Sequence, residues 1–321
     1  MKRPGQAATN DEHDAETAIA AVDAWRGKAV SYAPMAGGLA SPSHRGVDSV
    51  RWSVEVDGFP DAFFLKVLTA EHAHFVDIET SFTAASAGAA VGATPTPYHV
   101  LPSARAIVTE CLPTEWRAAR MDDLRKPAVL GKAIELKKAI HRGPSLGRRW
   151  TIFDRMRTFD AARRQAGVEG PADLWWMLDW AEEIEKAILA AGFDVKPGHG
   201  DGLASNIMLG PDGAVTLVDF DEARDDDPYC ELGALLNEAF QFESEMEPGL
   251  EMFEGSVRGA SMNRCRAYSV VDDLVWGIWG LLMDKVSPRG GIEFLKYAQW
   301  RLLRCRMALR DPALESRLRK L

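Results

Sequence analysis

The first third of the chain alternates short runs of β-branched and aromatic residues with turn residues. Runs at 52–56 and 63–67 flank Asp57-Gly58, an arrangement typical of a β-hairpin. The pattern then predicts one helix and two further strands, at 70–87, 98–101 and 106–110. This part of the chain is expected to form a small β-rich unit.

Beyond Leu112-Pro113 the apolar residues recur every three or four positions, which is the spacing of amphipathic helices. Helices are expected at 128–141, 150–166, 172–191, 270–283 and 292–309. The pattern therefore predicts an α+β protein of two lobes. Residues 1–112 would form the small β-rich lobe with one helix, and residues 113–321 a larger, mainly helical lobe that carries one β-hairpin.

That hairpin brings three polar side chains together. Apolar runs at 207–209 and 214–218 are separated by Gly-Pro-Asp-Gly, which closes a turn. Pairing Leu209 with Ala214 places Asn206 opposite the end of the second strand, where Asp219 lies. Asp201 precedes Asn206 by five residues on a glycine-rich loop, so its carboxylate can reach the same region.

Two carboxylates and an amide oxygen suit Mg²⁺, which prefers oxygen ligands and keeps positions for water and phosphate. In phosphoryl transfer, a loop aspartate accepts the proton of the acceptor hydroxyl. The alternative is a polar hairpin whose Asp and Asn cap turns. The order His-x-Asp-x-x-x-x-Asn, followed by a strand that ends in Asp-Phe-Asp, favours the catalytic interpretation.

The set His199, Asp201, Asn206 and Asp219 resembles the kinase-like phosphotransferases, the superfamily of aminoglycoside phosphotransferases and choline/ethanolamine kinases. The resemblance implies a protein-kinase-like fold with ATP and Mg²⁺ as cofactors. It assigns Asp201 as the catalytic base, Asn206 and Asp219 as Mg²⁺ ligands, and His199 as a residue that braces the loop.

A nucleotide-binding loop is expected before the first hairpin, where Gly37, Gly38 and Ser41 lie in the run GGLASPS. Backbone N–H groups exposed by small residues can approach phosphate oxygens. An ordinary surface turn is the alternative for this loop. The run resembles the Gly-Gly-Leu loop of choline kinases.

Lys66 lies inside the apolar run FFLKV, so its stem is expected to be buried and its ammonium directed at an ATP phosphate or, alternatively, at solvent. The resemblance implies that Glu79 on the next helix pairs with Lys66. It further implies that adenine contacts the backbone from Glu110 to Leu112.

Aromatic residues mark the acceptor side. Trp276 and Trp279 lie three apart on an expected helix, and Tyr297 lies on the next. Such rings pack into a core or surround a quaternary ammonium. The segment VWGIWGLLMDKVSPRGGIEFLKYAQWR resembles the C-terminal region of choline/ethanolamine kinases, which implies that these three residues bind substrate and that Glu238 lies near the metals.

Two departures from the family pattern affect the acceptor side. Glu243 takes a position where choline kinases place a ring, and the run DFDEA replaces the commoner Asp-Phe/Trp-Glu-Tyr-Ala, which loses a tyrosine. A primary amine or another cationic alcohol is therefore an open alternative to choline.

Charge and cysteine usage narrow the class of partner. The net charge of −9 gives no electrostatic footprint for nucleic acid or an anionic membrane. The four cysteines are scattered without a CxxC pair, and the N-terminus lacks the apolar stretch of a secretory signal. We expect a cytoplasmic protein whose partner is a small molecule.

These observations together predict an ATP-dependent kinase that phosphorylates choline, ethanolamine or a related amino alcohol. An aminoglycoside-type phosphotransferase and a nucleotide-binding pseudokinase are the alternatives. The run Gly143–Gly147 fits the G-x-S-x-G motif of hydrolases, but a charged helical pattern precedes it where that motif needs a buried strand.

Overall fold

The N-terminal part of the chain is built around one antiparallel sheet. The computed structural model describes residues 1–35 and 47–321, and in them five strands lie in the order β1-β2-β3-β5-β4. These strands are β1 Val30–Pro34, β2 Ser49–Val56, β3 Phe63–Leu68, β4 Pro97–Leu101 and β5 Ala106–Glu110. The runs expected as strands are confirmed, and β1 extends the sheet at its edge.

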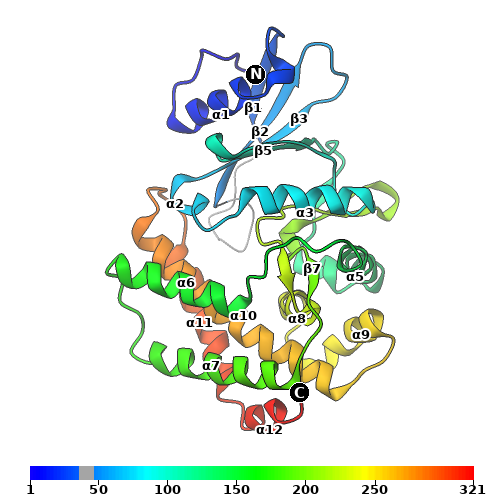
Figure 1. The fold of residues 1–321 in the computed structure, drawn as a ribbon, viewed down its shortest axis with the longest axis vertical. Helices are drawn as coiled ribbons and strands as arrows, with labels where there is room; N and C mark the ends of the chain where they lie inside the picture. The colour runs from blue at the N-terminus through cyan, green and yellow to red at the C-terminus, as the bar shows by residue number, and fades with distance from the viewer. Residues whose placement is uncertain (36–46) are drawn as a thin grey trace.

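Helices cover both sides of this sheet (Figure 1). They are α1 Asn10–Ala20, α2 Ala70–Ala73 and α3 Ile78–Ala90. The sequence pattern predicted one helix over 70–87, but the chain forms α2 and α3 there because the side chain of Asp77 accepts the N–H of Thr80 and starts a new helix. Helix α1 was not predicted, and it packs its alanine face on the sheet.

The C-terminal part is mainly helical, as predicted. Its helices are α4 Met121–Leu124, α5 Pro127–His141, α6 Ile152–Gln165, α7 Leu174–Ala191, α8 Pro228–Ala239, α9 Glu243–Glu254, α10 Gly259–Val286, α11 Phe294–Leu309 and α12 Leu314–Leu318. The helices expected at 128–141, 150–166, 172–191 and 292–309 match α5, α6, α7 and α11. The division into lobes between residues 112 and 113 stays a prediction.

Short strands position the polar loop. They are β6 Arg117–Ala118, β7 Lys196–Gly198, β8 Ile207–Leu209, β9 Val215–Leu217 and β10 Arg224–Asp226. The hairpin β8–β9 forms with Leu209 opposite Val215, one residue later than the expected partner Ala214, because a single 3₁₀ turn lengthens the connection. The N–H of Val218 still bonds the carbonyl of Asn206 at 2.9 Å, so Asp219 follows directly beyond Asn206.

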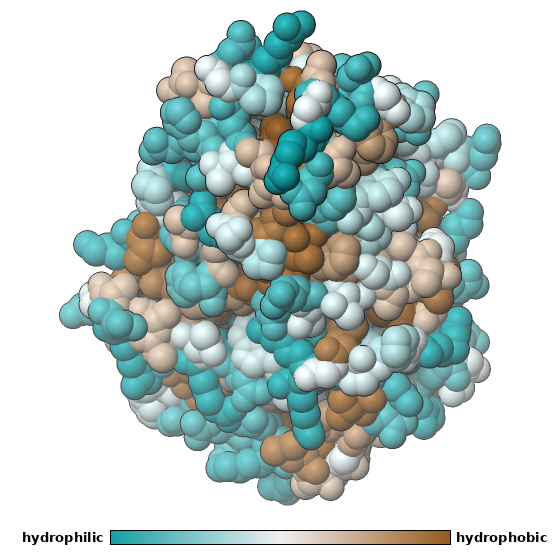
Figure 2. Space-filling model, turned by 45° about the horizontal axis from the view of Figure 1, so that its top comes forward, coloured by the Kyte–Doolittle hydropathy of each residue, from teal (hydrophilic) through white to brown (hydrophobic). Residues whose placement is uncertain are grey.

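Helix α10 forms the centre of the C-terminal core. It is buried along most of its length and packs against α6, α8 and α11. Hydrophilic residues predominate on the face in Figure 2, where hydrophobic residues are exposed in scattered groups. In the described part of the chain, every helix is too short or too polar to cross a membrane.

Two helical glycines provide a test of this packing. A Cβ on Gly233 of α8 would lie 2.5 Å from the carbonyl oxygen of Cys265 in α10, a backbone atom, whereas a Cβ on Gly131 of α5 would lie 3.7 Å from a methionine sulfur. We expect Gly233→Ala to lower the free energy of unfolding by about 1–3 kcal/mol through overpacking. Gly131→Ala should raise it by about 1 kcal/mol because alanine favours the helix. Urea unfolding of both variants checks this, and a Gly233→Ala protein as stable as Gly131→Ala would contradict it.

Candidate active site

The loop between β7 and β8 holds Asp201 in one orientation. Asn206 Nδ2 donates to Asp201 Oδ2 at 2.5 Å, and the backbone N–H of Leu203 donates to Asp201 Oδ1 at 2.7 Å. Both carboxylate oxygens therefore have a donor, and the amide oxygen of Asn206 points away from Asp201. The structure brings Asp201 and Asn206 together as the sequence predicted.

His199 ties the loop to the strand that precedes Asp219. Its Nε2 lies 2.9 Å from the carbonyl oxygen of Val218, and its ring meets that of Phe220 edge-on at 4.6 Å. A carbonyl accepts hydrogen bonds only, so Nε2 carries the proton and Nδ1 accepts from Lys137 Nζ at 3.3 Å. Burial and the nearby ammonium of Lys137 lower the pKa of His199, which keeps the imidazole neutral.

A buried ion pair that the sequence analysis missed supports the same loop. Lys137 Nζ donates to the carbonyl oxygen of Asp201 at 2.6 Å and to Glu231 Oε2 at 3.0 Å. Glu231 Oε2 also accepts the N–H of Gly200 at 2.9 Å, and its other oxygen contacts His141. Burial raises the pKa of Glu231, but the charges of Lys137 and His141 outweigh it, so the pKa lies well below 4.5.

A signal for this pair was present in the sequence. Lys137 falls in the apolar stripe of α5, whose buried positions are Leu130, Ala133, Ile134, Lys137 and Ile140. A lysine at such a position needs a buried partner. The spacing identifies the lysine but does not identify Glu231 as its partner.

Lys66 of β3 connects the N-terminal sheet to the second acidic segment. Its Nζ lies 2.7 Å from Asp219 Oδ1 and 2.7 Å from Asp221 Oδ2. Burial lowers the pKa of Lys66, and the charges of Asp219 and Asp221 outweigh this and raise it. Burial also raises the pKa of Asp221 to about 7. Lys66 is therefore a buried cation at the junction of the two parts, as its position in FFLKV suggested.

The other residues expected on the nucleotide side are more dispersed. Glu79 is exposed in the first turn of α3, while Lys66 pairs with the two aspartates described above. Glu110 ends β5, where its carboxylate accepts the N–H of Thr96 at 3.2 Å, and Leu112 is half-buried in the segment that follows. Gly37, Gly38 and Ser41 lie outside the described residues.

The three predicted acceptor-side rings come together. Trp276 and Trp279 meet edge-on with centroids 5.4 Å apart, and Trp279 meets Tyr297 at 6.2 Å. Trp279 and Tyr297 are only 3% and 5% exposed, and Trp276 is half-buried. Trp279 Nε1 donates to His72 Nδ1 of α2 at 3.4 Å, so this cluster also joins the two parts of the chain.

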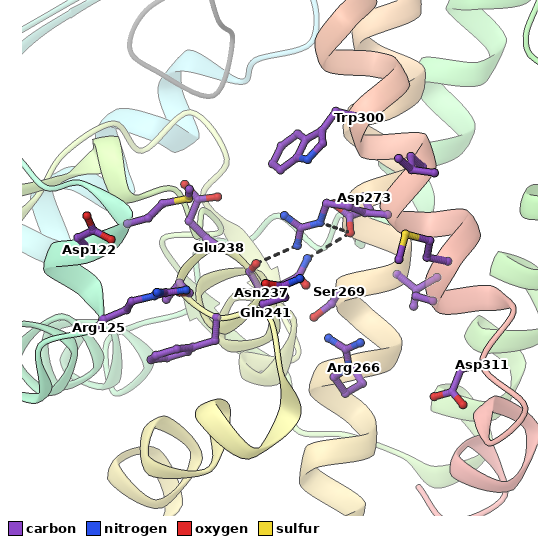
Figure 3. Close-up of a pocket in the computed structure, with 18 residues that line it drawn as sticks. Asp122, Arg125, Asn237, Glu238, Gln241, Arg266, Ser269, Asp273, Trp300 and Asp311 are labelled. Carbon is purple, nitrogen blue, oxygen red and sulfur yellow. Dashed lines mark hydrogen bonds and ion pairs between the residues drawn. The ribbon is translucent and has the colours of Figure 1, made fainter.

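Glu238 of α8 borders a cavity of about 650 Å³ between α4, α8, α10 and α11 (Figure 3). Burial and the charge of Asp201 raise the pKa of Glu238 to about 6, although the nearby Arg301 acts in the opposite direction. Glu238 is therefore close enough to Asp201 for their charges to interact, whereas Asp201 does not line the cavity.

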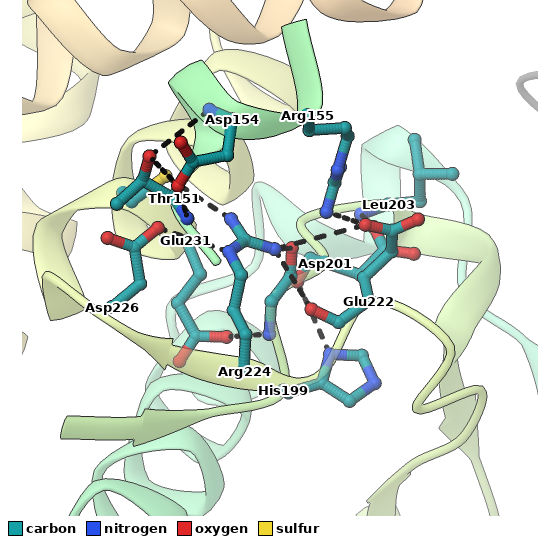
Figure 4. Close-up of polar contacts among 12 residues, drawn as sticks. Thr151, Asp154, Arg155, His199, Asp201, Leu203, Glu222, Arg224, Asp226 and Glu231 are labelled. Atoms are coloured by element: carbon teal, nitrogen blue, oxygen red, sulfur yellow. Dashed lines mark hydrogen bonds and ion pairs between the residues drawn. The ribbon is translucent and has the colours of Figure 1, made fainter. Parts of the chain in front are cut away.

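The acceptor side also contains an ion pair that was not predicted. Arg155 of α6 pairs with Glu222, and the two side chains lie beside Asp201 (Figure 4). The guanidinium of Arg155 lies over the rings of Trp150 and Trp276, at 5.4 and 5.5 Å from their centroids. No local pattern in the sequence signals a pair between α6 and the residue three after Asp219.

The donor set fits a magnesium ion. Lys66 pairs with Asp219 Oδ1, and the amide nitrogen of Asn206 donates to Asp201. These two contacts leave Asp219 Oδ2 and Asn206 Oδ1 as the oxygen atoms that could bind a metal. Within residues 1–35 and 47–321, no group of three or more His, Cys, Asp or Glu side chains is arranged to hold a metal. Mg²⁺ needs only one or two protein carboxylates because water and substrate phosphates complete its shell.

Several solved structures resemble this chain in fold. The chain is similar in structure to a choline/ethanolamine kinase family protein from Mesorhizobium loti, with a TM-score of 0.73 and 20% identity over 97% of this chain and 98% of the other. Choline kinase LicA from Streptococcus pneumoniae matches with a TM-score of 0.73 and 16% identity, over 92% of this chain and 99% of the other. A spectinomycin phosphotransferase in complex with ADP and spectinomycin matches with a TM-score of 0.56 and 15% identity, over 91% of this chain and 94% of the other.

At these identities the similarity is one of fold, and it confirms the predicted kinase-like architecture. No curated protein sequence matches the chain. The model of the phosphotransferase enzyme family (APH) matches residues 41–268, which include Lys66 and the whole loop from His199 to Asp219. Because that match spans most of the chain, the protein belongs to the phosphotransferase enzyme family.

Proposed function

We propose that this phosphotransferase is an ATP- and Mg²⁺-dependent kinase that phosphorylates the hydroxyl of choline, ethanolamine or a related amino alcohol. The observation that carries the proposal is the fixed carboxylate of Asp201, with Asn206 bonded to it and Asp219 directly beyond Asn206. A non-catalytic nucleotide-binding protein has no chemical need for such a base.

The nucleotide would bind between the N-terminal sheet and this loop. Lys66 brings a cation to the junction, where it can meet the phosphates and still contact Asp219. The segment from Glu110 to Leu112 would receive adenine through its backbone. Gly37, Gly38, Ser41 and Glu79 complete the proposed nucleotide-binding set by resemblance to the family.

Asn206 and Asp219 would hold Mg²⁺ through their free oxygens, with Glu238 as a further acidic residue near the metal. When bound, the ion neutralises the phosphate oxygens and the charge that develops during transfer. The acceptor hydroxyl oxygen forms a bond to the γ-phosphorus as the bond to ADP breaks. Asp201 takes the hydroxyl proton, and His199 holds the loop that carries it.

The acceptor's ammonium would lie on the side of Trp276, Trp279 and Tyr297. The carboxylates of Glu222 and Glu238 border this region, and that of Glu222 is paired with Arg155. Dispersed carboxylates are also how aminoglycoside phosphotransferases meet their amines, so an amino sugar is the second candidate. An ADP-release assay over choline, ethanolamine and aminoglycosides distinguishes these acceptors, and nucleotide binding without ADP release on any alcohol would indicate a pseudokinase.

Replacing the proposed base tests the mechanism. In Asp201→Asn the loop retains its shape, but the side chain no longer takes a proton. We expect kcat to fall by about 10²–10⁴-fold while the Kd for ATP stays within about twofold. Asp212→Asn, in the exposed turn of the same hairpin, is the matched control and should keep full activity. Turnover in Asp201→Asn equal to that of the control would rule out the assignment.

The pair that supports the loop gives a second test. Glu231→Gln leaves Lys137 charged and buried without its partner, so we expect the free energy of unfolding at pH 7 to fall by about 3 kcal/mol. The lowered pKa of Glu231 contributes stability that is present above 4.5 and is lost as the pH falls. The difference between wild type and variant should therefore shrink below pH 4.5.

Urea unfolding as a function of pH measures this difference. Glu183→Gln removes an exposed ion pair with Lys186 and is the control, with an expected change below about 1 kcal/mol. A pH-independent difference between wild type and Glu231→Gln would show that the carboxylate charge is not what stabilises the loop.

A further inference from the structure

The aromatic face expected to receive the acceptor's ammonium is already covered by a cation of the protein. Arg155 is 1% exposed, and its guanidinium lies between Trp150 and Trp276. Each cation–π contact of this kind uses the negative ring face that a quaternary ammonium would need. Trp276 therefore presents less free ring surface than the sequence suggested.

The other two rings of the expected cage are also packed against protein groups. Trp279 contacts Phe294 and Trp276 edge-on, and its indole N–H bonds His72. Tyr297 lies 5.9 Å from the guanidinium of Arg301 and is 5% exposed. Three methyl groups of a quaternary ammonium need several ring faces at once, and the described side chains leave few of them open.

Glu222 changes the chemistry at the same place. It stands where the family pattern Asp-Phe/Trp-Glu-Tyr-Ala has a tyrosine, so a carboxylate replaces a ring. Its side chain is 11% exposed, and its Oε2 contacts Arg155 and lies 3.9 Å from Arg224 Nη1. A carboxylate recognises an ammonium through N–H donors, and a quaternary ammonium has none.

The position of this pair relative to Asp201 makes it relevant to the acceptor. Burial and the charge of Arg224 lower the pKa of Arg155 to about 9. Figure 4 shows Arg155 and Glu222 on the same side of the loop as Asp201. An alcohol that reaches Asp201 therefore has its other end close to Glu222.

The local charge still favours a cationic acceptor. Arg155 and Arg224 are balanced by Glu222 and Asp226. Arg301 and Arg304 are balanced by Asp272 and Asp273. The carboxylate of Asp201 then adds negative charge beside these neutral groups. A small ammonium is attracted to this region although a guanidinium is already present.

We propose that Arg155 and Glu222 make the acceptor site selective for an alcohol whose ammonium carries N–H groups, and that they exclude the trimethylammonium of choline. The inference rests on the proposed function and narrows its substrate class. Small primary amino alcohols and amino sugars share this chemistry, and the choice of acceptors below separates them.

The first experiment compares acceptors on the wild-type enzyme. We expect kcat/KM to fall along the series ethanolamine, N-methylethanolamine, N,N-dimethylethanolamine and choline, with choline at least about tenfold below ethanolamine. Kanamycin provides the amino-sugar arm, and a higher kcat/KM for it than for ethanolamine would identify that source of the N–H groups. Choline turned over as well as ethanolamine would overturn the inference while leaving the proposed function intact.

The second experiment replaces the pair. Arg155→Met/Glu222→Tyr removes both charges together, because either one alone would leave a buried charge unpaired, and it restores a ring at position 222. We expect the ratio of kcat/KM for choline to that for ethanolamine to rise at least about tenfold, with KM for ATP unchanged. Arg157→Met/Glu185→Gln, which removes an ion pair between α6 and α7, is the control and should leave the ratio unchanged.

Arg155→Gln/Glu222→Gln also removes both charges but adds no ring, and it serves if the first double variant does not fold. Loss of the carboxylate should lower kcat/KM for ethanolamine more than for choline. An unchanged ratio in a folded variant would show that the pair has only a structural role. A wild-type enzyme that releases ADP with other alcohols but with no amine would contradict the proposed function itself, and this inference with it.

Discussion

The buried contact between Lys137 and Glu231 is the interaction on which the active-site loop depends. The lysine bonds the backbone of Asp201 and the ring of His199, while the glutamate bonds the backbone of Gly200. Two buried side chains thus hold three consecutive loop residues in place. Two buried charges of opposite sign cost less together than either does alone, so the loop has one conformation that satisfies both.

A second set of polar contacts crosses between the sheet and the helical part. Lys66 contacts Asp219 and Asp221, and Trp279 contacts His72. Lys66 lies in β3 and His72 in the adjoining helix α2, so a movement of the sheet would displace the proposed metal site and the proposed acceptor side together.

The sequence pattern predicted those features that depend on residues close together in the chain. The turn Gly-Pro-Asp-Gly and its apolar flanks fixed the hairpin, and hence the meeting of Asn206 and Asp219, to within one residue of register. The contacts Lys137–Glu231 and Arg155–Glu222 join residues 94 and 67 positions apart, and each depends on how helices α5 and α6 pack. Periodicity shows that such side chains are buried, but partners that distant are chosen by the tertiary structure.

The same distinction explains how one fold serves different acceptors. Asp201, Asn206 and Asp219 lie on or beside a hairpin whose geometry follows from its turn and its supporting ion pair, and under the proposed function phosphoryl transfer constrains all three. Arg155 and Glu222 belong to elements that only border the hairpin, and no step of the transfer requires their charge. Because changing one residue of a buried ion pair leaves the other charge unpaired, a different acceptor side would require both residues to change together.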